Sequence, residues 1–118
     1  MKKLKRIDGA CAVVALLYVS GLSEDTVLRI CRLHGFEDGR GMEDAEWKEA
    51  AQELGIKTRS VPVSPQRLRK FVHDHKEGLF LIGTHDHIFV LDAGLIVDPR
   101  NETPPGLGRI VQQAWRVG

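Results

Sequence analysis

The chain has 118 residues, a length that fits one domain with a single hydrophobic core. With 42% hydrophobic and 28% charged residues, its composition is that of a soluble globular protein. The formal net charge of +1 lacks the excess of basic residues that would favour binding to nucleic acid. No apolar run reaches the roughly eighteen residues that a membrane span requires. The two cysteines form no recognisable disulfide framework. We therefore expect one cytoplasmic domain over residues 1–118, with free thiols and no nucleic-acid or membrane partner.

An apolar stretch over residues 10–19 predicts a helix that is buried on nearly every face. Asp8 suits the N-cap, which places Cys11 in the first turn, where the helix dipole favours a thiolate. Cys11 is therefore a candidate nucleophile, although a buried cysteine often serves as a small hydrophobic residue. A secretory signal peptide is a further alternative, because basic residues precede the apolar run. Asp8–Gly9 interrupts that junction, which favours the buried helix.

Three more helices are predicted along the chain. Ser23 caps the second helix, and Cys31 lies on its apolar face, where we assign it to the core. The third runs from about Glu43 to Leu54; Trp47 is assigned to the core or to partly covered surface, and to no functional site. Ser64–Pro65 predicts the start of the fourth helix, since proline is favoured in the first helical position. The expected buried stripe of that helix is Leu68, Phe71 and Val72.

The second half of the chain has the pattern of β-strands. A short strand is expected over residues 56–63, and the apolar run of residues 79–82 suits a central strand. Residues 87–92 and 95–98 are interpreted as a tight hairpin through Ala93–Gly94, and residues 110–117 as a last strand. The expected fold class is α+β, with N-terminal helices packed on a C-terminal antiparallel β-sheet.

The register of the predicted hairpin brings a histidine and an aspartate to one face. A two-residue loop pairs Asp92 with Leu95 and Val90 with Val97, so that Phe89 faces Asp98. His87 is then a diagonal neighbour of Asp98, within reach of a carboxylate–imidazole hydrogen bond. A three-residue loop would turn Asp98 to the other face. His85, two residues earlier, competes with His87 as a base.

These segments resemble the papain-like cysteine peptidases, and most closely the branch that processes bacteriocin leaders after a double glycine. Residues 11–16 resemble the nucleophile helix of that branch, and residues 87–99 resemble its His and Asp-Pro segments. The length is also similar to that of small stand-alone members encoded by bacteriophages. The resemblance implies a papain-like fold, no cofactor, a peptide or protein substrate, and a catalytic triad of Cys11 as nucleophile, His87 as base and Asp98 as the group that orients His87.

The chain departs from that family at the oxyanion donor. The family has a glutamine about six residues before the cysteine, whereas this chain has Lys5 there and no Gln or Asn in residues 1–10. Lys5 is the substitute donor that the position offers, and Asp8 adds a negative charge that opposes a thiolate. Three hypotheses therefore remain: a cysteine hydrolase or acyl-transferase, a catalytically inactive relative that binds a peptide or protein, and a metal site built from Cys11, His85 and His87.

Overall fold

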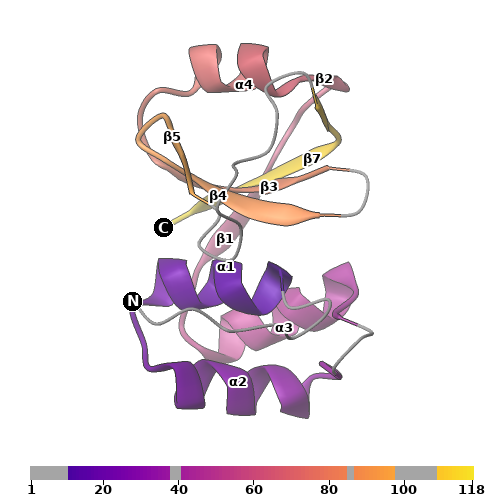
Figure 1. The fold of residues 1–118 in the computed structure, drawn as a ribbon, viewed down its shortest axis with the longest axis vertical. Helices are drawn as coiled ribbons and strands as arrows, with labels where there is room; N and C mark the ends of the chain where they lie inside the picture. Colours follow the sequence, from indigo (N-terminus) through magenta and orange to yellow (C-terminus); the bar gives the residue numbers. More distant parts are fainter. Residues whose placement is uncertain (1–10, 38–40, 85–86, 98–108) are drawn as a thin grey trace.

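Four helices and an antiparallel β-sheet make up the computed structural model, which describes residues 11–37, 41–84, 87–97 and 109–118. Helices α1–α3 lie on one side of the sheet and α4 on the other (Figure 1). The predicted α+β class is confirmed. The helices are α1 (Cys11–Ser20), α2 (Glu24–Leu33), α3 (Asp44–Glu53) and α4 (Leu68–Asp74). The strands are β1 (Thr58–Val61), β2 (Gln66–Arg67), β3 (Leu79–Gly83), β4 (Ile88–Asp92), β5 (Leu95–Val97), β6 (Ile110–Val111) and β7 (Gln113–Val117).

The main sheet has the strand order β1-β7-β3-β4-β5, and every neighbouring pair is antiparallel. The apolar run of residues 79–82 therefore does form a central strand, as predicted. Strands β2 and β6 make a separate two-stranded sheet near α4. Because β7 inserts between β1 and β3, the last strand of the chain lies beside the hairpin of β3 and β4.

Strand β4 is buried on both faces and separates two apolar cores. Ile88 and Val90 belong to the core shared with α1, α2 and α3. Phe89 and Leu91 belong to the core beneath α4. Side chains alternate along a strand, so this run of apolar residues serves both layers at once.

Helix α1 is the apolar helix that the sequence predicts. All six residues from Ala12 to Leu17 are buried, so the helix has no solvent-facing stripe in this part. Gly21 follows it with φ 66°, a left-handed conformation that ends a helix at little cost for glycine. Helix α1 lies between α2 and the sheet (Figure 1).

Capping fixes the starts of the next two helices. The Ser23 hydroxyl oxygen accepts a hydrogen bond from the Thr26 N–H at 3.3 Å, which confirms the predicted cap of α2. Glu43 caps α3 through a capping box with Glu46. Cys31 is buried, as predicted for the core face of α2.

The predicted start of the fourth helix at Ser64–Pro65 is wrong. Helix α4 begins at Leu68, and the two residues before it pair as strand β2 with β6. The Leu68 N–H donates to the Arg109 carbonyl oxygen at 2.7 Å. Pairing with a distant segment therefore outweighs the local helix signal of proline. Leu68 and Phe71 are buried as expected, and Val72 is partly buried.

The last strand is interrupted at Gln112, although the sequence predicts one strand over residues 110–117. The Gln112 N–H donates to the Gly83 carbonyl oxygen at 2.9 Å, and β6 and β7 on either side of it join different sheets. The predicted strand over residues 56–63 is also shorter than expected, because only β1 pairs with β7. Both differences arise from pairing partners that a single stretch of sequence does not specify.

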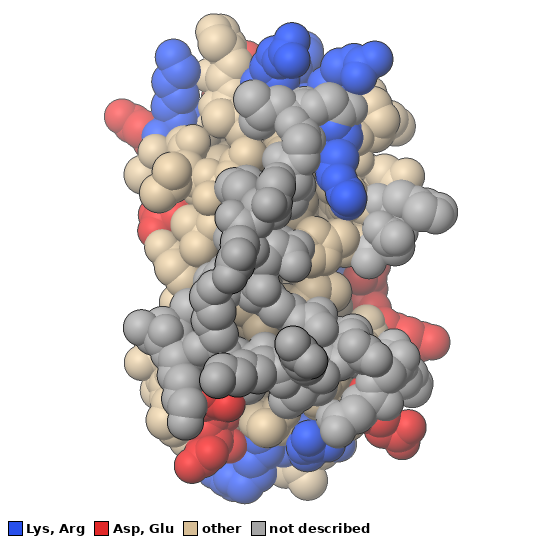
Figure 2. Space-filling model, viewed as in Figure 1, with Lys and Arg blue, Asp and Glu red and all other residues tan. Residues whose placement is uncertain are grey.

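Among the described residues, no helix is long and apolar enough to cross a membrane. On the described part of the face in Figure 2, Lys and Arg side chains gather at the two ends of the long axis, over α4 and over α2. The junction between the helices and the sheet lies between these two basic ends.

The β4–β5 hairpin has the predicted register, with Asp92 opposite Leu95 and Val90 opposite Val97. Its two loop residues, Ala93 and Gly94, have φ 50° and 84°, the positive values that a type I′ turn needs at both positions. Ala93 therefore adopts a left-handed conformation that costs a non-glycine residue about 1–2 kcal/mol.

We expect Ala93→Asn to stabilise the protein by about 0.5–1 kcal/mol, because asparagine tolerates the left-handed conformation better than alanine. The measurement is the free energy of unfolding in urea. Gly94→Ala is the matched control and should destabilise the protein by about 1 kcal/mol. An Ala93→Asn variant less stable than the parent would contradict the turn assignment.

His34 at the end of α2 joins that helix to α3. Its Nε2 lies 2.9 Å from Glu53 Oε1, and its Nδ1 lies 3.6 Å from Glu49 Oε2. The hydrogen bond to Glu53 raises the pKa of His34 and outweighs the opposing effect of burial. A raised pKa in the folded state means that the pair stabilises the protein fully below the ordinary histidine pKa, about 6.5, and less as the pH rises through the folded value.

The stability difference between the parent and a His34→Gln variant should therefore be largest at pH values below about 6.5 and should shrink at alkaline pH. Urea unfolding on both sides of that pH measures it. Glu53→Gln should show the same trend, because it removes the main partner. A difference that does not change with pH would refute the proposed ion pair.

Candidate active site

The N-terminus of α1 holds Cys11 against the start of β4. Helix α1 packs along β4, with the Cys11 end at Ile88 and the Tyr18 end at Asp92. The Tyr18 hydroxyl donates to Asp92 Oδ2 at 2.8 Å and so anchors the far end of the contact. The Asp92 carboxylate raises the pKa of Tyr18. A buried apolar helix, anchored by one polar contact, thus fixes where the thiol lies along the strand.

Cys11 makes the contacts that stabilise a thiolate. Burial alone would raise the pKa of its thiol, but a hydrogen bond with the His87 side chain and backbone bonds with Ile88 and Ala12 act in the opposite direction. The net result is a Cys11 pKa below the ordinary value for cysteine. The nearby His87 charge adds to the effect. The structure thus brings together two of the residues that the sequence singles out, Cys11 and His87.

His87 lies immediately before β4. Its carbonyl oxygen accepts a hydrogen bond at 2.9 Å from the N–H of Thr84, the residue that follows β3, which fixes the His87 backbone. The His87 ring stacks on the Phe89 ring, with ring centroids 5.8 Å apart and an interplanar angle of 26°. This agrees with the prediction that His87 and Phe89 share a face of the hairpin.

The remaining predicted site residues lie outside the described residues: Asp98, Lys5, His85 and Asp8. The β4–β5 register that underlies the pairing of His87 with Asp98 is confirmed as far as Val97. The position of Asp98 itself stays a prediction, as does the role of Lys5 as an oxyanion donor.

A cleft of about 500 Å³ opens beside Cys11 and His87. It lies where the start of α1, the start of α3 and one end of the sheet meet. Cys11 is therefore not sealed among aliphatic side chains, which was the alternative to a catalytic role. The cleft is lined by Cys11, Ala12, Met42, Glu43, Asp44, Trp47, Gly83, Thr84, His87, Ile88, Gln112, Gln113 and Trp115.

The sequence assigns Trp47 to the core or to partly covered surface, and the structure confirms the core position; the sequence did not show that Trp47 also lines the cleft. Trp47 is buried and packs edge-on against Trp115, with ring centroids 4.8 Å apart and an interplanar angle of 86°. Both rings also line the cleft. The two tryptophans of the chain are a signal that the sequence offers. The pattern of apolar residues in the sequence does not show that α3 and β7 contact each other.

Cys31 provides an internal comparison for Cys11. It is fully buried in α2, and burial raises its pKa to about 12. Cys11 is partly exposed and has a lowered pKa. The two thiols of the chain therefore differ in both access and ionisation, which are the two properties that control cysteine reactivity.

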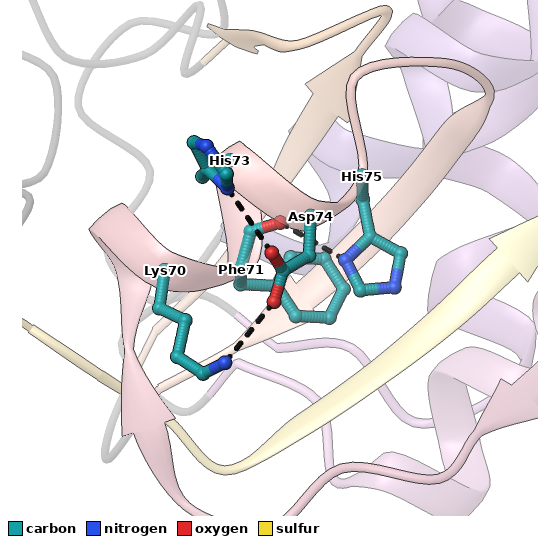
Figure 3. Close-up of polar contacts among 5 residues, drawn as sticks. All are labelled: Lys70, Phe71, His73, Asp74 and His75. Atoms are coloured by element: carbon teal, nitrogen blue, oxygen red, sulfur yellow. Dashed lines mark hydrogen bonds and ion pairs between the residues drawn. The ribbon is translucent and has the colours of Figure 1, made fainter.

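Among the described residues, no group of three or more His, Cys, Asp or Glu side chains could hold a metal ion. The histidines near the end of α4 point in different directions, as predicted for residues two apart on a helix (Figure 3). His73 Nδ1 lies 3.1 Å from Asp74 Oδ1, whereas His75 stacks on the Phe71 ring with centroids 3.9 Å apart. Asp74 also accepts from Lys70 Nζ at 3.3 Å, so this cluster is a set of local contacts on α4.

The sequence matches no known protein family and no curated protein, and the fold matches no solved structure. The site is therefore interpreted from its own geometry and chemistry.

Iodoacetamide at neutral pH should alkylate Cys11 stoichiometrically and leave Cys31 unmodified in the folded protein, because only the first thiol is partly exposed and has a lowered pKa. Peptide mapping by mass spectrometry measures both sites. Unfolding in urea should make both cysteines reactive, which controls for detection. Equal reactivity of the two thiols in the folded state would contradict the description of the site.

Proposed function

We propose that this protein is a cysteine-dependent hydrolase, a peptidase or amidase on a papain-like α+β domain, that acts on a peptide or protein substrate in the cytoplasm. The observation that carries the proposal is the hydrogen bond between the Cys11 thiol and the His87 side chain, both of which line a cleft of about 500 Å³. A lowered thiol pKa beside an imidazole is the arrangement that nucleophilic thiol catalysis requires. The resemblance of residues 11–16 and 87–99 to the bacteriocin-leader-processing branch supports the same chemistry.

The proposed reaction starts from a Cys11 thiolate and a His87 imidazolium. The sulfur attacks the substrate carbonyl carbon, and the carbonyl electron pair moves to its oxygen as the C–S bond forms. When the tetrahedral intermediate collapses, the C–N bond breaks and His87 gives its proton to the leaving amine. Water gives a proton to His87 as its oxygen attacks the thioester carbon; the C–S bond then breaks, which releases the carboxylic acid and restores the Cys11 thiolate and the His87 imidazolium. This reaction cycle conserves protons and electron pairs and needs no cofactor.

The developing oxyanion needs hydrogen-bond donors. The first turn of α1 has backbone N–H groups without acceptors inside the helix, and it is the positive end of the helix dipole. Lys5 is proposed as the second donor, in place of the family's glutamine. Asp98 is proposed to orient the His87 ring and favour its charged form, on the register that β4 and β5 share.

The second candidate function is a catalytically inactive domain that binds a peptide or protein partner in the same cleft. The specific observation in its favour is that residues 1–10 contain no Gln or Asn. Loss of one oxyanion donor costs about a hundredfold or more in rate. The cleft and its aromatic lining would serve binding equally well.

Hydrolysis of a mixture-based library of peptides, each with a fluorogenic C-terminal amide, distinguishes the cysteine hydrolase from the inactive binding domain. We expect hydrolysis by the parent protein, and losses of about a thousandfold or more in kcat/KM for Cys11→Ala and for His87→Ala, because the two residues act as one unit. Cys31→Ala should keep the parent rate.

Hydrolysis that persists in Cys11→Ala would refute the proposal. If no peptide is cleaved, covalent capture by peptidyl vinyl sulfones decides the question. Cys11 that reacts with them no faster than free cysteine would favour the binding domain.

A further inference from the structure

A glutamine at the start of the last strand lines the cleft beside the nucleophile. Gln113 is the first residue of β7, and it lines the same cleft as Cys11 and His87. Its side chain is exposed. Within the described part of the chain, the Gln113 carboxamide has no recorded hydrogen-bond partner. The cleft therefore contains an amide group that is available to a bound molecule.

The register of the sheet places the Gln113 side chain on the face that α1 covers. Trp115, two residues further along β7, packs in the core shared with α1, α2 and α3, whereas Ala114 packs in the core beneath α4. Side chains alternate along a strand, so Gln113 shares the face of Trp115. In agreement, a Cβ at Gly83 would lie 3.6 Å from the Gln113 Cβ and 3.4 Å from the Trp115 ring. Gln113 thus lies on the same side of the sheet as the nucleophile helix.

Two strand spacings separate Gln113 from the strand that contacts the thiol (Figure 1). Gln113 pairs with Gly83 on β3, and Gly83 pairs with Ile88 on β4. Cys11 contacts the Ile88 backbone. Neighbouring strands lie about 4.8 Å apart, so about 10 Å separates the Gln113 and Ile88 backbones. An extended glutamine side chain spans about half of that distance, and the remainder matches the size of one acyl group bonded to the Cys11 sulfur.

The chemistry proposed for Cys11 needs a side-chain donor of fixed position. Attack by the sulfur on a carbonyl carbon places negative charge on the carbonyl oxygen, and a carboxamide N–H is a donor that stabilises this charge. Residues 1–10 contain no Gln or Asn, and Lys5, proposed above as a donor, has a long flexible stem. Gln113 belongs instead to a strand that pairs with both β1 and β3, which holds the start of its side chain in place.

We infer that the Gln113 carboxamide is an oxyanion donor of this site and supplies, from the last strand, the amide that residues 1–10 lack. Its N–H donates to the carbonyl oxygen of the substrate as the C–S bond forms. The inference rests on the proposed function for the reaction that this donor serves. The donor itself is measurable with a compound that adds to the thiol and is not hydrolysed.

Acetamidoacetaldehyde, the aldehyde of N-acetylglycine, is such a probe. The Cys11 thiolate adds to its carbonyl carbon, the carbonyl electron pair moves to the oxygen, and that oxygen takes the His87 proton to give a hemithioacetal. Iodoacetamide alkylates the same thiol by displacing iodide, and no oxyanion forms. In a Cys31→Ala background, the aldehyde concentration that halves the rate of alkylation measures hemithioacetal formation. The rate without aldehyde measures the reactivity of the thiol alone.

We expect Gln113→Ala to raise that aldehyde concentration about tenfold or more and to keep the alkylation rate without aldehyde within about twofold of the parent rate. Gln113→Glu keeps the shape of the side chain but has no N–H donor, so it should weaken aldehyde binding at least as much. Gln52→Ala is the matched control, because Gln52 is an exposed glutamine of α3 that does not line the cleft. It should keep both values, and circular dichroism confirms that each variant is folded.

Equal aldehyde binding by the parent and by Gln113→Ala would overturn the inference. A fall confined to Gln112→Ala, the other glutamine of the cleft, would also overturn it. So would an equal change in the alkylation rate, because the substitution would then act on the thiol itself. An aldehyde that does not protect Cys11 in the parent would overturn both the inference and the proposed function.

Peptide hydrolysis then separates the inference from the proposed function. We expect Gln113→Ala to lower kcat about a hundredfold with little change in KM, because the donor acts mainly in the transition state. If the parent cleaves peptides and Gln113→Ala keeps its kcat, the inference fails and the proposed function stands. If the aldehyde result holds but no peptide is cleaved, the proposed hydrolase function fails and the oxyanion donor stands.

Discussion

The contact between the first turn of α1 and the start of β4 is the constraint on which the site depends. It places a thiol against an imidazole, and hydrogen bonds from His87 and from the Ile88 and Ala12 backbone offset the burial that would otherwise keep the thiol neutral. Helix α1 packs directly on the sheet because its residues from Ala12 to Leu17 are all apolar and buried. The Tyr18–Asp92 hydrogen bond anchors its other end. The chemistry proposed for the site thus follows from the packing of α1 on β4.

The strand order of the sheet builds the cleft next to that contact. Because β7 lies between β1 and β3, Trp115 packs edge-on against Trp47 on α3, and both rings line the cleft. The start of α3 brings its capping residue Glu43 and its first residue Asp44 to the lining of the same cleft.

Local patterns in the sequence predicted much of this arrangement. Helix α1, the Ser23 cap, the central strand β3 and the two-residue hairpin turn all depend on neighbours in the chain, and they are confirmed. The pairing of Cys11 with His87 was expected from their resemblance to a known nucleophile helix and His segment, and the structure brings the two residues together.

The failures have one physical origin. Ser64–Pro65 has a strong local helix signal, but Gln66 and Arg67 pair with β6 instead. The last strand, predicted over residues 110–117, is interrupted at Gln112 because β6 and β7 join different sheets. Both depend on contacts between segments far apart in the chain, and hydrophobic periodicity carries no information on which segments meet.

The ultraviolet absorbance of the Cys11 thiolate, followed as a function of pH in a Cys31→Ala background, tests the Cys11–His87 pairing most directly. The predicted result is thiolate absorbance that appears below the ordinary cysteine pKa of about 8.5, with a shift to higher pH when His87 is replaced by alanine. An absorbance that rises only at or above the ordinary pKa, and that His87→Ala leaves unchanged, would contradict the account.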